Sequence, residues 1–147
     1  MLNNLLFLLT LGICWTCVEL QTKTETKTEL AVVDYEYVKR ATSDNSILIV
    51  DVREPSEVEE LGKIPNSINI PLMTVSNALG TVSDEEFLKL YGRQKPSKDA
   101  EIIFYCRTGK RAAQAQQFAV DLGYTNTKNY RGSWRDWTKH TQNHSSS

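Results

Sequence analysis

Two continuous apolar runs constrain the fold of this chain more than any other feature. They occupy residues 47–50 (ILIV) and 102–105 (IIFY), and polar turn residues precede each of them. Short apolar runs of this kind are typical of strands that are covered on both faces. Because stretches with helical patterns follow both runs, the sequence predicts an α/β fold with helices on the faces of a sheet.

Signals for other strands and helices alternate along the rest of the chain. Asp34 can cap one helix, and Ser83 begins another with a capping-box pattern. The alanines that follow the second apolar run would let their helix pack closely on the sheet. We expect further strands at 31–33, 68–70 and 127–130, and helices at 35–41, 57–61, 72–79, 83–91, 112–122 and 134–137.

The composition fits one globular domain. The chain has 147 residues, of which 40% are hydrophobic and 24% are charged, and this length supports one workable core. The net charge of -1 gives no reason to expect nucleic acid or an acidic membrane surface as a partner. The sequence contains no internal repeat, so a single domain is predicted.

Both ends of the chain differ in character from this domain. Residues 5–18 are almost wholly apolar but too short for a typical transmembrane helix, which favours a signal peptide over stable membrane insertion. A signal anchor or a misassigned start codon are the alternatives. We therefore expect a signal peptide (1–20), a polar linker (21–29), a folded domain (30–140) and a polar tail (141–147).

The apolar N-terminal leader (residues 1–20) determines the expected location of the protein. A signal peptide would direct the chain to the secretory pathway or the extracellular space, where Asn143 in an Asn-His-Ser sequon would be a glycosylation acceptor. A cytoplasmic or mitochondrial location is the alternative, although the leader lacks the arginines of a mitochondrial presequence.

Chemistry is expected at Cys106, where the second apolar run ends. Arg107, Lys110 and Arg111 follow within five residues, and an alanine-rich helical pattern begins at Ala112. A thiol at such a strand-to-helix turn faces backbone N–H groups and the positive end of a helix dipole. These donors and the nearby cations favour the thiolate, which is the nucleophilic form of cysteine.

The alternative interpretation is an inert buried cysteine that ends a strand, which is the more common fate of a lone cysteine. That interpretation leaves three cations in one small turn unexplained, so we favour a reactive thiol. If the leader is removed, Cys106 is the only cysteine and no internal disulfide can form.

The histidines narrow the chemistry further. The chain has only two, His140 and His144, and both lie near its polar end, outside the predicted elements. Neither a cysteine–histidine hydrolase nor a metal site is therefore expected. A loop of backbone donors with Arg and Lys instead suits a small oxyanion such as thiosulfate, sulfate or phosphate.

Three segments resemble the rhodanese domain, and they occur in the order of that family. They are 47–72 (ILIVDVREPSEVEELGKIPNSINIPL), 102–112 (IIFYCRTGKRA) and 122–134 (LGYTNTKNYRGSW). The resemblance is to small single-domain thiosulfate sulfurtransferases. It implies a five-stranded, mainly parallel sheet with helices on both faces, and it identifies Cys106 as the nucleophile.

Loop length separates two chemistries that occur on this fold. Phosphatases of the related dual-specificity type carry a cysteine, five residues and then an arginine, whereas here Arg111 comes after four residues. The resemblance therefore implies sulfur transfer without a cofactor. Cys106 would take the outer sulfur of thiosulfate, or of another sulfane-sulfur donor, as a persulfide and pass it to cyanide, glutathione or a protein thiol.

The same resemblance assigns the rest of the site. Substrate binding falls to the loop after the nucleophile: its cations would neutralise the sulfonate and its N–H groups would hold the persulfide. The residues are Arg107, Thr108, Gly109, Lys110 and Arg111.

Three further residues are expected to support the site. Asp51 and Arg53 follow the first apolar run, at the sheet edge where parallel sheets bind ligands. Ligand binding and a buried ion pair that braces the active loop are the two interpretations, and Arg53 is therefore ranked as a supporting residue. Trp134 would pack in the core or form an apolar rim. Lys63 and Ser133 depart from the family pattern, which more often has histidine and glycine there.

Two functions from other classes compete with sulfur transfer. A non-catalytic rhodanese-like binding or stress module is the first, and the intact cysteine and cations count against it. A phosphatase or arsenate reductase is the second, and the loop length disfavours it.

Overall fold

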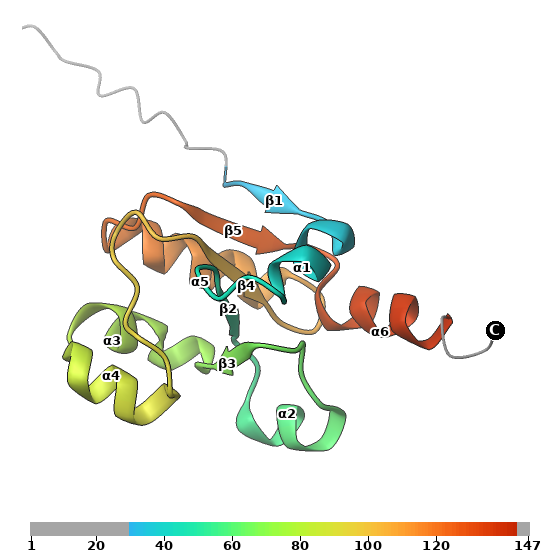
Figure 1. The fold of residues 1–147 in the computed structure, drawn as a ribbon, viewed down its shortest axis with the longest axis horizontal. Coiled ribbons are helices and arrows are strands. Elements are labelled where there is room, and N and C mark those ends of the chain that lie inside the picture. Colours follow the sequence, from blue (N-terminus) through green and yellow to red (C-terminus); the bar gives the residue numbers. More distant parts are fainter. Residues whose placement is uncertain (1–29, 144–147) are drawn as a thin grey trace, which may run out of the picture.

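The computed structural model describes residues 30–143, which form one parallel sheet covered by helices on both faces (Figure 1). The strands are β1 (Val32–Val33), β2 (Leu48–Asp51), β3 (Ser67–Asn69), β4 (Ile102–Tyr105) and β5 (Thr127–Tyr130). Their order across the sheet is β1-β5-β4-β2-β3, and every neighbouring pair is parallel. The predicted α/β fold with a five-stranded sheet is therefore confirmed.

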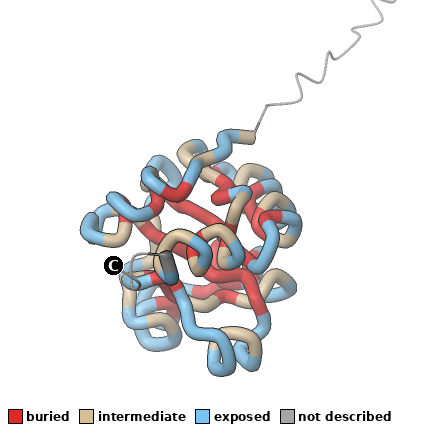
Figure 2. Tube along the Cα trace, turned by 90° about the vertical axis from the view of Figure 1, so that its right-hand side faces the viewer, coloured by how far each residue is buried: buried red, intermediate tan, exposed pale blue. Residues whose placement is uncertain are grey.

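The two central strands explain why their sequences are apolar without interruption. Alternate side chains of a strand point to opposite faces, and in β2 Leu48 and Val50 pack in one core cluster while Ile49 packs in the other. In β4, Phe104 and Tyr105 divide in the same way. Both faces of the sheet are therefore buried at its centre. Figure 2 shows the buried segments in the interior of the fold.

Helices cover the sheet as two layers. Buried residues of α3 (Val75–Gly80), α4 (Asp84–Tyr91) and α5 (Lys110–Asp121) pack in one cluster, and those of α1 (Tyr35–Ala41) and α6 (Ser133–Asn143) pack in the other. The remaining helical segments are α2 (Pro55–Leu61) and the 3₁₀ turn η1 (Leu72–Thr74). None of the helices within 30–143 is long and apolar enough to cross a membrane.

Helix ends agree with the capping signals of the sequence. The Asp34 carboxylate accepts the N–H of Tyr37 at the start of α1, and the Ser83 hydroxyl accepts the N–H of Glu86 at the start of α4. Gly62 and Gly92 follow the last residues of α2 and α4 with positive φ. Local side-chain chemistry thus fixes these boundaries, which the sequence predicts to within a few residues.

The end of the chain differs from the prediction. Helix α6 begins at Ser133 and runs to Asn143, so His140 lies in a helix and not in an unstructured tail. Its ring stacks on Tyr35 with centroids 4.1 Å apart, and Trp137 packs against the same tyrosine at 5.3 Å. These contacts with α1 are tertiary. Because the segment is polar in composition, its sequence does not predict that the helix continues to Asn143.

Two smaller differences concern the helices. The stretch 72–79 divides into the η1 turn and α3. In α5, the polar residue Gln116 is buried, and its side-chain amide donates to the carbonyls of Ala31 and Thr127. The three alanines Ala112, Ala115 and Ala119 are also buried, as the predicted close packing of this helix on the sheet requires.

Residues 1–29 and 144–147 lie outside the described residues. The predicted signal peptide and linker fall there, as does most of the tail, and the side chain of Asn143 is not described either.

Candidate active site

Cys106 lies at the carboxyl edge of the sheet, directly after β4. Its residue is 1% exposed, and a loop of three residues separates it from Lys110 at the start of α5. The Gly109 N–H points at the sulfur, with 3.1 Å between N and Sγ. The strand end and the helix start therefore place the thiol beside a backbone donor, as the sequence pattern predicts.

Gly109 is the one loop position that excludes a side chain. Its φ is +88°, in the left-handed region that favours glycine. A Cβ at this position would lie 2.4 Å from the backbone oxygen of Arg131. The close approach of these two backbone segments keeps the Gly109 N–H turned toward the thiol.

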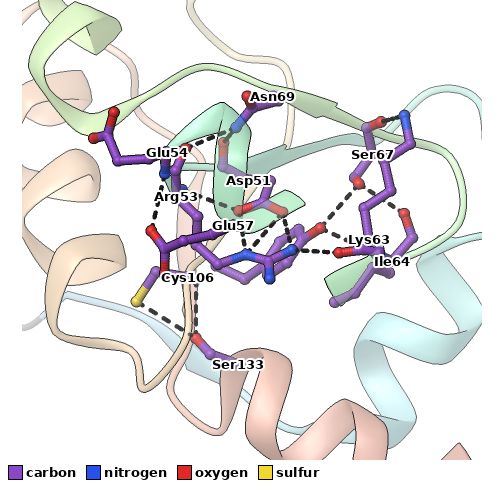
Figure 3. A network of polar contacts seen from close by, with 12 residues as sticks. Asp51, Arg53, Glu54, Glu57, Lys63, Ile64, Ser67, Asn69, Cys106 and Ser133 are labelled. Atoms are coloured by element: carbon purple, nitrogen blue, oxygen red, sulfur yellow. Dashed lines mark hydrogen bonds and ion pairs between the residues drawn. The ribbon is translucent and has the colours of Figure 1, made fainter. Parts of the chain in front are cut away.

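Ser133, the first residue of α6, holds the cysteine from the other side. Its hydroxyl accepts the Cys106 N–H at 3.1 Å, donates to the Tyr130 carbonyl at 2.7 Å, and lies 4.0 Å from the cysteine sulfur (Figure 3). Ser133 is completely buried and its φ is +54°, an uncommon value for a residue other than glycine. Sequence reasoning treats Ser133 only as a departure from a family motif and misses this contact.

Two backbone hydrogen bonds also join the cysteine loop to the start of α6. The Trp134 N–H donates to the Cys106 carbonyl at 2.9 Å, and the Arg135 N–H donates to the Arg107 carbonyl at 3.2 Å. The first turn of α6 would otherwise leave these N–H groups without partners. The cysteine loop and the start of α6 therefore form one hydrogen-bonded unit.

The three loop cations have different surroundings. Arg107 and Lys110 are exposed, and their side chains make no ion pair within the described residues. Arg111 is half-buried and forms a bidentate ion pair with Glu57 of α2, with N–O distances of 2.6 and 2.8 Å. Two of the three cations are therefore free to meet an anion, and the third is already paired.

The Glu57–Arg111 pair changes the titration of both groups. The hydrogen bond from Arg111 lowers the pKa of Glu57 to about 2. The hydrogen bond to Glu57 raises the pKa of Arg111, and the charge of Cys106 acts in the same direction. The sequence gives no signal for this pair, because its members lie 54 positions apart.

Asp51 and Arg53 form a fully buried ion pair beneath the site. The closest approach is 2.6 Å between Arg53 Nη2 and Asp51 Oδ2, and the same nitrogen donates to the Gly62 carbonyl at 2.7 Å (Figure 3). The Arg53 guanidinium also lies over the Trp134 ring, 4.8 Å from its centroid. Burial opposes the charge of Arg53, but the hydrogen bonds and charge of Asp51 outweigh it and raise its pKa.

This ion pair connects three segments that surround the cysteine. It joins the end of β2 to the turn after α2 and, through the ring of Trp134, to the start of α6. Asp51 and Arg53 do not reach the cysteine loop by any hydrogen bond within residues 30–143. The Asp51–Arg53 pair therefore stabilises the segments beneath the site, and we call this pair the brace.

Comparisons with known proteins identify the family of this chain. The rhodanese-like domain family matches residues 34–140. A Schizosaccharomyces pombe relative, named putative thiosulfate sulfurtransferase, mitochondrial, is 41% identical over 113 residues, which cover 74% of this chain and 78% of the relative. The Saccharomyces cerevisiae thiosulfate:glutathione sulfurtransferase is 39% identical over 128 residues, which cover 86% of this chain and 89% of the relative.

A solved structure shows the same fold. The human single-domain sulfurtransferase TSTD1 aligns with a TM-score of 0.68 and 34% identity, and the alignment covers 74% of this chain and 95% of the human one. The chain therefore belongs to the rhodanese-like domain family. Within that family it is a sulfurtransferase of the rhodanese type, as its named relatives are.

Proposed function

We propose that this protein is a thiosulfate sulfurtransferase that carries the transferred sulfur as a persulfide on Cys106. The observation that carries the proposal is the Gly109 N–H, 3.1 Å from a buried thiol at the end of the central strand. A backbone donor in this position stabilises the thiolate and the anionic persulfide alike. The names of the relatives supply thiosulfate as the donor.

The reaction has two steps that balance without a cofactor. The Cys106 thiolate attacks the outer sulfur of thiosulfate, a new S–S bond forms, and the S–S bond of the donor breaks as sulfite leaves with its electron pair. An acceptor thiolate then attacks the outer sulfur of the Cys106 persulfide. The acceptor leaves as a persulfide, and the Cys106 thiolate is regenerated.

The loop residues take the roles that the site geometry supports. Arg107 and Lys110 are exposed and carry charges that are free to neutralise the sulfonate of the donor. Arg111, held by Glu57, contributes a fixed positive charge. Thr108 and Gly109 act through their backbone groups, and the Gly109 N–H donates a hydrogen bond to the sulfur. Asp51, Arg53 and Trp134 support the loop from below.

The acceptor is a thiol, for which glutathione or a protein thiol are the candidates, and cyanide can replace it in an assay. Two relatives are named thiosulfate:glutathione sulfurtransferases, one from Saccharomyces cerevisiae and one human. Their names support glutathione as the acceptor for this chain.

The location of the protein remains a prediction. Residues 1–20 are predicted as a signal peptide, whereas two relatives, from Schizosaccharomyces pombe and Saccharomyces cerevisiae, carry the word mitochondrial in their names. The relatives favour the mitochondrial alternative over secretion. Fractionation of cells that express the tagged full-length chain, compared with a chain lacking residues 1–20, distinguishes these locations.

One pair of assays tests the proposed activity. Thiocyanate formation from thiosulfate and cyanide is measured beside hydrolysis of p-nitrophenyl phosphate, for the unchanged protein and for Cys106→Ala. We expect the first activity only, and we expect Cys106→Ala to abolish sulfite release. Phosphate-ester hydrolysis without sulfur transfer, or full sulfur transfer by Cys106→Ala, would refute the proposal.

A further inference from the structure

A shallow cleft lies beside the cysteine loop. It has a volume of about 280 Å³, opens widely to solvent between that loop and α6, and is lined by Thr108, Gly132, Arg135, Asp136 and Lys139. Three of the five carry a charge, and four of them lie at or next to the first two turns of α6. The cleft is therefore polar and belongs to the same hydrogen-bonded unit as the thiol.

The charge available in this cleft is positive. Arg135 and Lys139 lie four residues apart, on one side of α6, and both are exposed. Neither side chain makes an ion pair or hydrogen bond with any residue that the structure describes. Asp136 is already engaged, because its carboxylate accepts the Tyr130 hydroxyl at 2.7 Å and lies 3.3 Å from His140 Nδ1.

Two lining residues of the cleft are the chain neighbours of residues that contact the cysteine sulfur. Thr108 precedes Gly109, whose N–H contacts Sγ at 3.1 Å, and Gly132 precedes Ser133, whose hydroxyl lies 4.0 Å from Sγ. From Ser133 to Lys139 the helix rises about 9 Å. The cleft thus lies next to the residues that hold the thiol, and it carries two cations that have no partner among the described side chains.

We propose that this cleft binds the acceptor, and that the acceptor class is a small thiol carrying a carboxylate, whose negative charge Arg135 and Lys139 bind. The inference rests on the proposed sulfurtransferase function and specifies its second step. Arg135 can take a carboxylate in bidentate fashion, and Lys139 adds a point charge one turn further along the helix. Binding the carboxylate there directs the thiolate of the same molecule toward the persulfide.

The sulfur transfer itself follows the balanced second step. The acceptor thiolate forms an S–S bond with the outer sulfur of the Cys106 persulfide, and the bond between that sulfur and Cys106 breaks. The electron pair returns to Cys106 as a thiolate. Arg135 and Lys139 take no part in bond making, so they act on the affinity for the acceptor.

A series of thiols that differ in charge tests the inference. Transfer from thiosulfate is measured with 3-mercaptopropionate (anionic), 2-mercaptoethanol (neutral) and cysteamine (cationic), and with glutathione. The measured quantity is the ratio of kcat/KM for each charged thiol to kcat/KM for the neutral thiol, because this ratio cancels general losses of activity or folded protein. The variants are Arg135→Glu, Lys139→Glu and, as a control with the same change in net charge, Lys89→Glu on α4.

We expect the anionic-to-neutral ratio to fall about tenfold in Arg135→Glu and in Lys139→Glu, and the cationic-to-neutral ratio to rise. Lys89→Glu should leave both ratios unchanged. Equal ratios in all variants would overturn the inference while leaving the sulfurtransferase function intact. No transfer from thiosulfate to any acceptor by the unchanged protein would overturn both.

Discussion

The buried hydroxyl of Ser133 makes the sharpest quantitative prediction for the site. This hydroxyl is the only partner of the Cys106 N–H within the described residues, and Ser133 has a φ of +54°. Ser133→Ala removes the acceptor but keeps the backbone conformation. Leaving one buried N–H group without a partner costs about 1–3 kcal/mol, so we expect the free energy of unfolding to fall by that amount.

Ser133→Gly separates the hydrogen bond from the backbone strain. It removes the same acceptor, but glycine adopts a left-handed conformation without the cost of about 1 kcal/mol that a Cβ brings. Ser133→Gly should therefore be more stable than Ser133→Ala by about 1 kcal/mol, and less stable than the unchanged protein.

Urea denaturation followed by tryptophan fluorescence measures these differences. Ser76→Ala on α3, an exposed serine, is the matched control and should change stability by less than about 0.5 kcal/mol. If Ser133→Ala is as stable as the unchanged protein, the hydroxyl does not hold Cys106. If Ser133→Gly is less stable than Ser133→Ala, the explanation by backbone strain is wrong.

Three further predictions concern the brace, the surface pair and the loop. Asp51→Asn leaves the Arg53 charge buried and unpaired, so we expect a loss of about 3–5 kcal/mol by urea denaturation; a loss below 1 kcal/mol would contradict the brace. The pKa of Glu57 is lowered to about 2, so its pair with Arg111 stabilises the fold fully above about pH 4.5 and progressively less toward pH 2. Because the pair is partly exposed, Glu57→Gln should lose about 1 kcal/mol at pH 7 and only a small fraction of that at pH 2, and a constant difference would refute this. Gly109→Ala would put a Cβ 2.4 Å from a backbone carbonyl, so thiosulfate turnover should drop at least tenfold; unchanged turnover would show that the loop is not held rigidly.

The central architecture is predictable from the sequence because local patterns determine it. The runs 47–50 and 102–105 are apolar at every position, and their short length between turn residues favours strands covered on both faces. Asp34 and Ser83 fix helix starts through bonds to N–H groups three residues away. Cys106 can be proposed as the nucleophile from the sequence alone because the cations lie next to it in the chain.

The rest of the site depends on contacts between distant segments. Glu57 meets Arg111 only because α2 and the start of α5 lie at the same edge of the sheet, and no local pattern records that pairing. The sequence marks Ser133 only as a replacement for glycine. Its positive φ and its hydrogen bond to Cys106 arise from the folded chain, so no local pattern predicts them. His140 belongs to α6 through stacking on Tyr35, which lies more than a hundred positions earlier.

In the proposed mechanism, sulfur resides on Cys106 between two half-reactions. Mass spectrometry of the protein after exposure to thiosulfate, without an acceptor, measures this directly. We predict an added mass of one sulfur atom on the peptide that contains Cys106, formed together with one equivalent of sulfite and removed by glutathione. Release of sulfite in equal amount by Cys106→Ser, or turnover without any added sulfur on this peptide, would contradict the account.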